Sequence, residues 1–136
     1  MPTDTQNLAM AVARLNRRLR QERQSDLTPT QLSVLGTVSQ LGPTSPSAVA
    51  ARERVSAPSV TRTLNCLVED GHVTREPHPD DGRQVVVSLS DTGAKVLEEE
   101  RQRRDAWLHR RLRELDPRER ALLREASALL TRIAES

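Results

Sequence analysis

The chain has 136 residues, of which 35% are hydrophobic and 29% are charged, and its formal net charge is +2. A chain of this size and composition folds into one compact domain, or a small domain with appended helices, and it is neither disordered nor membrane-spanning. Phe and Tyr are absent and Trp107 is the single aromatic residue, which disfavours a nucleic-acid binder that stacks bases on aromatic platforms.

The cysteine content and the N-terminal residues indicate the cellular compartment. Cys66 is the single cysteine, so no intrachain disulfide can form and a reducing compartment fits. The apolar stretch Leu8–Ala13 is too short and too closely followed by Arg14 to form a signal peptide. We therefore expect a cytoplasmic protein without a membrane segment.

Two helices are predicted in the first third of the chain. Apolar residues spaced as one helix face predict the first over 4–24; they are Leu8, Val12, Leu15 and Leu19. The second begins at Thr28, which can cap it, with Pro29 in its first turn and Gln31 able to reach back to the cap. Gly42-Pro43 then ends it.

Two shorter helices are predicted at 45–54 and 56–70, joined by a tight turn. Ser45 and Ser56 can cap them. The inner face of the second carries Val60, Leu64, Leu67 and Val68. Two helices joined in this way form a helix-turn-helix, whose second helix enters the major groove of DNA.

The opposite face of the helix at 56–70 carries groups suited to DNA. Arg62 can donate a fork of hydrogen bonds to guanine, Asn65 can pair with adenine, and Ser59 can contact a phosphate or a base. Ser56 places a helix N-terminus toward phosphate. An ordinary solvated helix face is the alternative. The predicted recognition residues are Ser56, Pro58, Ser59, Thr61, Arg62 and Asn65.

A hairpin and two helices complete the chain. Val73–Arg75 and Val85–Leu89 are β-prone runs around a turn rich in Pro, Asp and Gly, which predicts a hairpin with an extended tip. Ser90 caps a long helix that contains no Gly or Pro from Lys95 to Leu115. A last helix begins at Asp116.

These elements predict a mainly α fold with a small β-hairpin wing. A winged helix-turn-helix domain occupies 28–89, and 4–24 and 90–134 form a discontinuous helical dimerisation region. The terminal helices carry apolar stripes without an obvious partner, and the polar residues 98–105 separate the C-terminal stripe from the winged domain. Exposed stripes of that size need cover, which favours a homodimer; a monomeric helix bundle is the alternative.

Five motifs occur in order along the chain: Leu27-Thr28-x-x-Gln31, Ser56-x-Pro58-Ser59-Val60-Thr61-Arg62, Leu67-x-x-Asp70-Gly71-x-Val73-x-Arg75, Asp81-x-Arg83 and Leu89-Ser90-x-x-Gly93. Together they resemble the MarR family of bacterial winged helix-turn-helix transcriptional regulators. The likeness extends over nearly the whole chain.

The resemblance implies a dimer that binds pseudo-palindromic double-stranded DNA in two successive major grooves and regulates transcription, more often as a repressor. It implies that Arg83 enters the minor groove, whose narrow form attracts arginine, and that Asp81 holds the wing by pairing with a nearby arginine. Gly82 departs from the pattern, because the family often has a second basic residue there. Cys66 lies in the recognition helix, whereas peroxide-sensing members keep their cysteine in the first helix.

The resemblance also implies a small phenolic or lipophilic effector bound between the dimerisation helices and the winged domain. The residues that would line such a cleft are Leu15, Arg18, Leu19, Leu35, Trp107 and Arg111. The three histidines show no metal-ligand spacing, and no nucleophile lies beside a base. We therefore expect no metal, no cofactor and no enzymatic activity.

Two other functions remain open from the residues. The winged domain at 28–89 carries five arginines and six carboxylates, so a winged-helix module that binds proteins and has lost DNA binding is the first alternative. A redox switch at Cys66 is the second. Arg62 and Arg83 favour the DNA-binding regulator.

Overall fold

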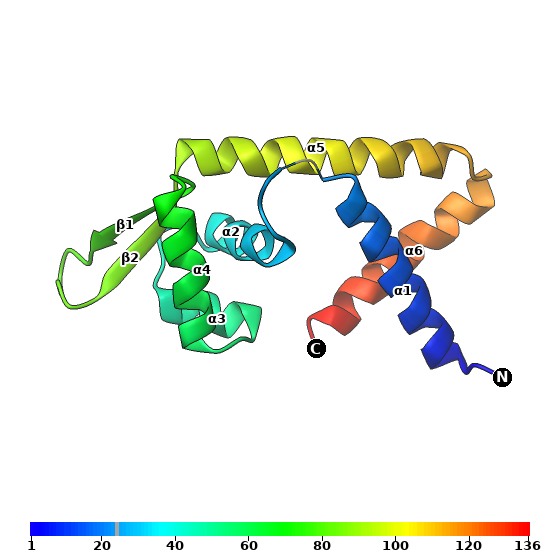
Figure 1. The fold of residues 1–136 in the computed structure, drawn as a ribbon. Coiled ribbons are helices and arrows are strands. Elements are labelled where there is room, and N and C mark those ends of the chain that lie inside the picture. The colour runs from blue at the N-terminus through cyan, green and yellow to red at the C-terminus, as the bar shows by residue number, and fades with distance from the viewer. Residues whose placement is uncertain (24) are drawn as a thin grey trace. The chain divides into compact units, whose positions relative to one another are not determined.

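The computed structural model describes residues 1–23 and 25–136, and within them six helices and a two-stranded antiparallel sheet follow one another (Figure 1). The predicted mainly α fold with a β-hairpin is confirmed. The elements are α1 (Asp4–Gln21), α2 (Pro29–Leu41), α3 (Pro46–Glu53), α4 (Ala57–Glu69), β1 (Val73–Pro77), β2 (Val85–Leu89), α5 (Asp91–Arg113) and α6 (Pro117–Ala134).

Reciprocal caps fix where several helices begin. At α2, the hydroxyl of Thr28 accepts a hydrogen bond from the backbone N–H of Gln31 at 3.1 Å, and the side chain of Gln31 accepts one from the N–H of Thr28 at 2.9 Å. The exchange satisfies two backbone donors that a helix start leaves unpaired. The same arrangement begins α1 at Thr3 and Gln6 and begins α6 at Asp116 and Glu119.

The first helix is shorter than its apolar spacing predicts. The prediction extended it to 24, but α1 ends at Gln21. The N–H of Glu22 bonds to the carbonyl of Leu19 at 3.3 Å, a three-residue closure that tightens the last turn and ends the helix. Gln24 lies outside the described residues.

The chain divides into two compact units, Arg23–Gln102 and 1–22 together with 103–136. The first, the winged unit, contains α2, α3, α4, the hairpin and the first half of α5. It extends beyond the 28–89 expected from sequence because Leu97 of α5 belongs to its buried cluster. The fully buried side chains of this core are Leu35, Val38, Val49, Val60, Leu67 and Val87.

The hairpin is fixed to the helices by backbone hydrogen bonds. β1 and β2 pair from Val73 opposite Leu89 to Pro77 opposite Val85. The second edge of β2 bonds to the α2–α3 connection, because Val87 and Thr44 exchange two backbone bonds of 2.7 and 3.0 Å. The base of the wing is therefore held on both sides.

The start of α5 packs closely on the end of α4. The hydroxyl of Ser90 accepts from the N–H of Gly93 at 3.0 Å and donates to the carbonyl of Gly71 at 2.6 Å. A Cβ on Gly93 would collide with the carbonyl oxygen of His72. Only glycine fits at this point, where the helix meets the wing's first strand.

The second unit, the terminal unit, leaves much apolar surface uncovered. Neither α1 nor α6 contains a buried residue. Within the described chain, no helix combines the length and hydropathy that a membrane span requires. The exposed apolar side chains on the two helices include Leu8, Met10, Val12, Leu15, Leu122, Leu123, Leu129, Leu130 and Ile133.

Candidate nucleic-acid interface

The helix-turn-helix predicted at 45–70 is formed by α3 and α4. Arg54 closes α3 in a left-handed conformation with φ of 57°, which a non-glycine residue adopts at some cost. Two residues later the side chain of Ser56 caps α4 by accepting from the N–H of Ser59. The turn between the two helices is therefore short, and α3 and α4 lie side by side in Figure 1.

The two faces of α4 divide as the apolar spacing predicts. Val60, Leu64 and Leu67 are buried in the core of the winged unit. The opposite face carries Pro58, Thr61 and Arg62, all exposed, with Ser59 and Asn65 half-buried. Burial of the inner face fixes the rotation of the helix, so the predicted recognition residues lie together on the side away from the core.

The side chains of Ser56, Ser59 and Arg62 differ in whether they have a hydrogen-bond partner. The hydroxyl of Ser56 donates to that of Ser59 at 2.9 Å. Arg62 makes no hydrogen bond or ion pair within the described part of the chain. Its guanidinium therefore remains available to an external partner.

Asn65 has a partner that sequence reasoning missed. Nη1 of Arg75, on β1, donates to Oδ1 of Asn65 at 2.6 Å. The two residues are ten apart in the chain, and the contact arises because β1 runs back beside α4. Arg75 ends one of the five sequence motifs, but only the folded structure pairs it with Asn65.

At the tip of the wing, Asp81 and Arg83 form an ion pair. Nε of Arg83 lies 3.2 Å from Oδ1 of Asp81, and the backbone N–H of Arg83 donates to the same oxygen at 3.1 Å. The side-chain bond, and then the backbone bond, lower the pKa of Asp81 below its ordinary value. The side chain of Arg83 remains 92% exposed, so the pair fixes an arginine that still faces solvent.

Comparison with known proteins extends the likeness beyond these motifs. The MarR family model matches residues 27–85. An HTH-type transcriptional regulator of Mycobacterium leprae (strain TN) is 44% identical over 130 residues, which cover 95% of this chain and 91% of that protein. This chain belongs to the MarR family.

Solved structures of MarR-family proteins agree with this assignment. A transcriptional regulator protein of Pseudomonas aeruginosa PA01 superposes with a TM-score of 0.85 at 38% identity, over 99% of both chains. A mutant MarR of E. coli, crystallised in complex with operator DNA, superposes with a TM-score of 0.69 at 28% identity, over 93% of both chains. The chain therefore shares its family's winged helix-turn-helix fold.

In the terminal unit of this MarR-family chain, Trp107 lies beside two of the other residues expected to line an effector cleft, Arg18 and Arg111. The Cζ atoms of Arg18 and Arg111 lie 5.1 and 5.6 Å from the centroid of the Trp107 ring, within range of cation–π attraction. Trp107 is buried, and its Nε1 has no hydrogen-bond partner in the part of the chain that the structure describes. Leu19 is half-buried and Leu15 is exposed.

Leu35 is placed differently from the other five cleft residues. It belongs to the winged unit and has no exposed surface. A side chain enclosed on all sides by the core of α2 and its neighbours has no surface with which to contact a ligand. In this structure Leu35 is a core residue.

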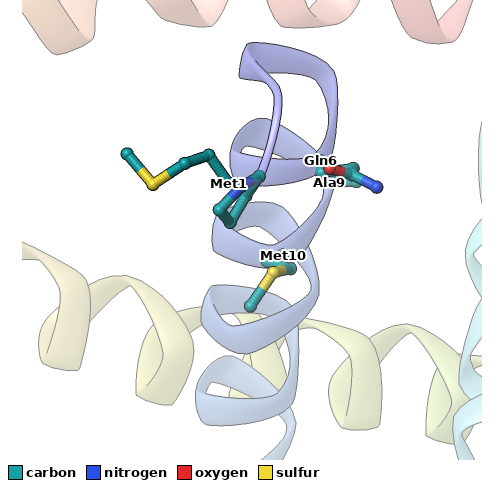
Figure 2. Close-up of a pocket in the computed structure, with 5 residues that line it drawn as sticks. Met1, Gln6, Ala9 and Met10 are labelled. Carbon is teal, nitrogen blue, oxygen red and sulfur yellow. The ribbon is translucent and has the colours of Figure 1, made fainter.

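Among the described residues, the remaining reactive groups form no site of their own. Cys66 is a free, exposed thiol on α4. In the part of the chain that the structure describes, no three His, Cys, Asp or Glu side chains gather so that they could hold a metal. A shallow hollow on the first turns of α1, where Figure 2 shows Met1, Gln6, Ala9 and Met10, is open and lined mainly by apolar atoms. It belongs to the uncovered apolar surface of α1.

Proposed function

We propose that this MarR-family chain is a dimeric transcriptional regulator that binds a pseudo-palindromic DNA operator and acts as a repressor. The observation that carries the proposal is the outer face of α4, where Arg62, which has no partner among the described residues, lies beside Ser59 and Asn65. The family fold is found on operator DNA in the related MarR of E. coli. A bound dimer would occupy a promoter and exclude other proteins from it.

Two parts of the winged unit would contact the two grooves of DNA: α4 the major groove, and the tip of the wing the minor groove. α4 enters the major groove, where Arg62 donates two hydrogen bonds to guanine and Thr61 contacts the backbone or a base. Ser56, at the N-terminus of α4, approaches phosphate, which the helix dipole favours. The exposed Arg83 enters the minor groove, with Asp81 holding its side chain at the wing tip.

The nearly balanced charge of the winged domain supports DNA binding through a small number of specific side-chain contacts. With five arginines against six carboxylates over 28–89, no broad basic surface draws the protein onto DNA. Non-specific affinity depends on the number of phosphates that a protein neutralises. We therefore expect weak binding to arbitrary DNA and a large advantage for the correct sequence.

The uncovered helices of the terminal unit support a homodimer. The large apolar side chains of α6 are exposed to between 39% at Leu130 and 61% at Ile133, and those of α1 include Leu8 at 48% and Leu15 at 46%. Apolar surface of this extent is stabilised by covering it with a second copy, at about 25 cal/mol per Å² buried. A dimer would also supply the second recognition helix that a palindrome requires.

The surroundings of Trp107 support a response to a small effector. Its buried Nε1 lacks an acceptor among residues 1–23 and 25–136, and Arg18 and Arg111 both lie against its ring. An acidic aromatic molecule would compete with Glu22 and Glu114, whose carboxylates lie 3.1 and 3.4 Å from the guanidinium groups of Arg18 and Arg111, and it would place its ring beside that of Trp107. Since Trp107 is the single tryptophan, its fluorescence during titration with benzoate tests this binding.

Selection from a library of random DNA duplexes tests the proposed function. We expect wild-type protein to enrich an inverted repeat whose half-sites lie about one helical turn apart, and we expect Arg62→Ala and Arg83→Ala to lose or relax the enrichment. Wild-type protein that enriches no sequence and binds DNA only weakly contradicts the proposal. That outcome would favour the protein-interaction module, which the acidic balance of the winged domain also suits.

A further inference from the structure

The contact between Arg75 and Asn65 determines which atom Asn65 presents outward. Arg75 carries only hydrogen-bond donors, so the Asn65 atom that faces it must be the carbonyl oxygen. The two ends of an amide are usually hard to distinguish by shape, but this partner fixes them. Nδ2 then lies on the side of the planar amide away from Arg75, and it has no hydrogen-bond partner among the described residues.

The hydrogen bond from Arg75 can hold the Asn65 amide in one orientation. A charged guanidinium donor and a separation of 2.6 Å indicate a short, charge-assisted hydrogen bond. Both anchors are rigid, because Asn65 follows the buried Leu64 on α4 and Arg75 lies in the paired part of β1, opposite Val87. The hairpin thus sets the orientation of a side chain on the recognition helix.

We propose that Arg75 is a positioning residue that makes Asn65 a hydrogen-bond donor toward DNA, so that the base pair facing Asn65 is selected against cytosine. In the major groove guanine presents two acceptors, adenine presents N7 and thymine presents O4, whereas cytosine presents only the donor N4 amino group. An outward Nδ2 bonds to the first three bases and meets cytosine donor to donor. This inference rests on the proposed function, because it requires α4 to lie in the major groove.

The predicted discrimination against cytosine would not be expected of an asparagine whose amide is free to turn over. An asparagine that can turn its amide over contacts a donor or an acceptor equally well. With Arg75 in place, cytosine at the facing position should weaken binding about tenfold relative to guanine, the scale of a single mismatched contact. Replacing Arg75 should release the amide and remove that discrimination while leaving the fold intact, because the side chain of Arg75 is exposed.

The experiment first locates the base pair and then changes the positioning residue. Comparing sequences selected by wild type and by Asn65→Ala identifies the pair that Asn65 faces. Affinities are then measured for four duplexes that differ only there, with wild type, Arg75→Met and the matched control Arg75→Lys, which keeps a donor. Circular dichroism checks that each variant is folded.

We expect wild type and Arg75→Lys to bind the cytosine duplex about tenfold more weakly than the guanine duplex, and Arg75→Met to bind both alike. In Asn65→Asp the donor becomes an acceptor, so cytosine should be admitted. Cytosine discrimination that persists in Arg75→Met, or that is absent from wild type, overturns the inference while leaving the proposed function standing. Failure of wild type to select any repeat contradicts the proposed function itself.

Discussion

Arg83 is anchored by Asp81 across a two-residue turn and still projects into solvent. Nε of Arg83 lies 3.2 Å from the Asp81 carboxylate, and the exposed fraction of the arginine side chain is 92%. Long side chains lose conformational freedom when they bind. An arginine already ordered by its neighbour loses less of that freedom on entering a DNA groove, so we expect Asp81 to contribute to DNA affinity without contacting DNA.

The pKa of Asp81 should report this pair. We expect Arg83→Ala to raise the pKa of Asp81, because the Arg83 side chain is the largest cause of its lowering. The backbone N–H at residue 83 still donates in the variant, so the pKa should stay below its ordinary value. A ¹³C NMR titration of the carboxyl group measures this, with Arg62→Ala as a control that leaves the pKa unchanged.

The same lowered pKa gives the pair a defined pH dependence. A carboxyl group with a lower pKa in the folded state than in the unfolded state stabilises the fold above its unfolded pKa. That contribution is lost as the pH falls through the folded pKa. If the titration gives one pKa for Asp81 in wild type and Arg83→Ala, the pair does not form in solution.

Gly93 should tolerate no side chain. Gly93→Ala places a Cβ against the carbonyl oxygen of His72, and backbone cannot move aside cheaply, so we expect a loss of about 1–3 kcal/mol in the free energy of unfolding. Gly36→Ala is the matched control. A Cβ there meets nothing within 4 Å on α2, and it should stabilise the helix by about 0.5–1 kcal/mol. The free energies of unfolding of both variants are measured in urea at one protein concentration. Equal changes in the two variants would contradict the close packing of α5 on the wing.

Leu35 should behave as a core residue and not as part of a ligand site. Leu35→Ala removes a side chain with no exposed surface and should cost about 2–5 kcal/mol of unfolding free energy. Leu41→Ala, at a position 37% exposed at the end of the same helix, should cost less than about 1 kcal/mol. Chemical denaturation measures both, and a Leu35→Ala protein of wild-type stability would refute the packing described here.

Self-association should depend on the apolar face of α6. We expect Leu129→Glu to dissociate the dimer, because it places a charge in the uncovered stripe, where Leu129 is 49% exposed. Ala128→Glu adds the same charge about 100° around the helix, toward its polar side, and should leave the dimer intact. Sedimentation gives the mass directly. Wild-type protein that sediments at the 15.2 kDa of one chain contradicts the proposed dimer.

Local sequence signals predicted most of the fold. Thr28 with Gln31, and Asp116 before Pro117, mark helix starts through caps that act within one turn. The spacing of Val60, Leu64 and Leu67 gave the buried face of α4 correctly. Such signals involve residues three or four positions apart, so they can be recognised directly in the sequence.

The side-chain contacts and the burial that the sequence did not predict depend on packing between helices and strands. The bond from Arg75 to Asn65 requires β1 to run beside α4, and neither residue type alone indicates it. Glu53 likewise accepts hydrogen bonds from Ser33 and Thr37, some twenty and sixteen residues earlier in the chain. Glu100 is only 6% exposed although it lies in a stretch of polar residues. Tertiary packing decides such positions, and spacing along the chain does not reveal it.

Sequence-specific DNA binding through α4 is the central claim, and one measurement tests it most directly. The affinities of wild type, Arg62→Ala and Arg124→Ala are compared for the selected repeat and for a scrambled duplex of the same length and salt concentration. Arg124→Ala removes the same charge from α6 of the terminal unit. We predict that wild type and Arg124→Ala prefer the repeat by about a thousandfold or more, and that Arg62→Ala lowers this preference at least about tenfold. Equal binding of wild type to both duplexes, or an unchanged preference in Arg62→Ala, would contradict it.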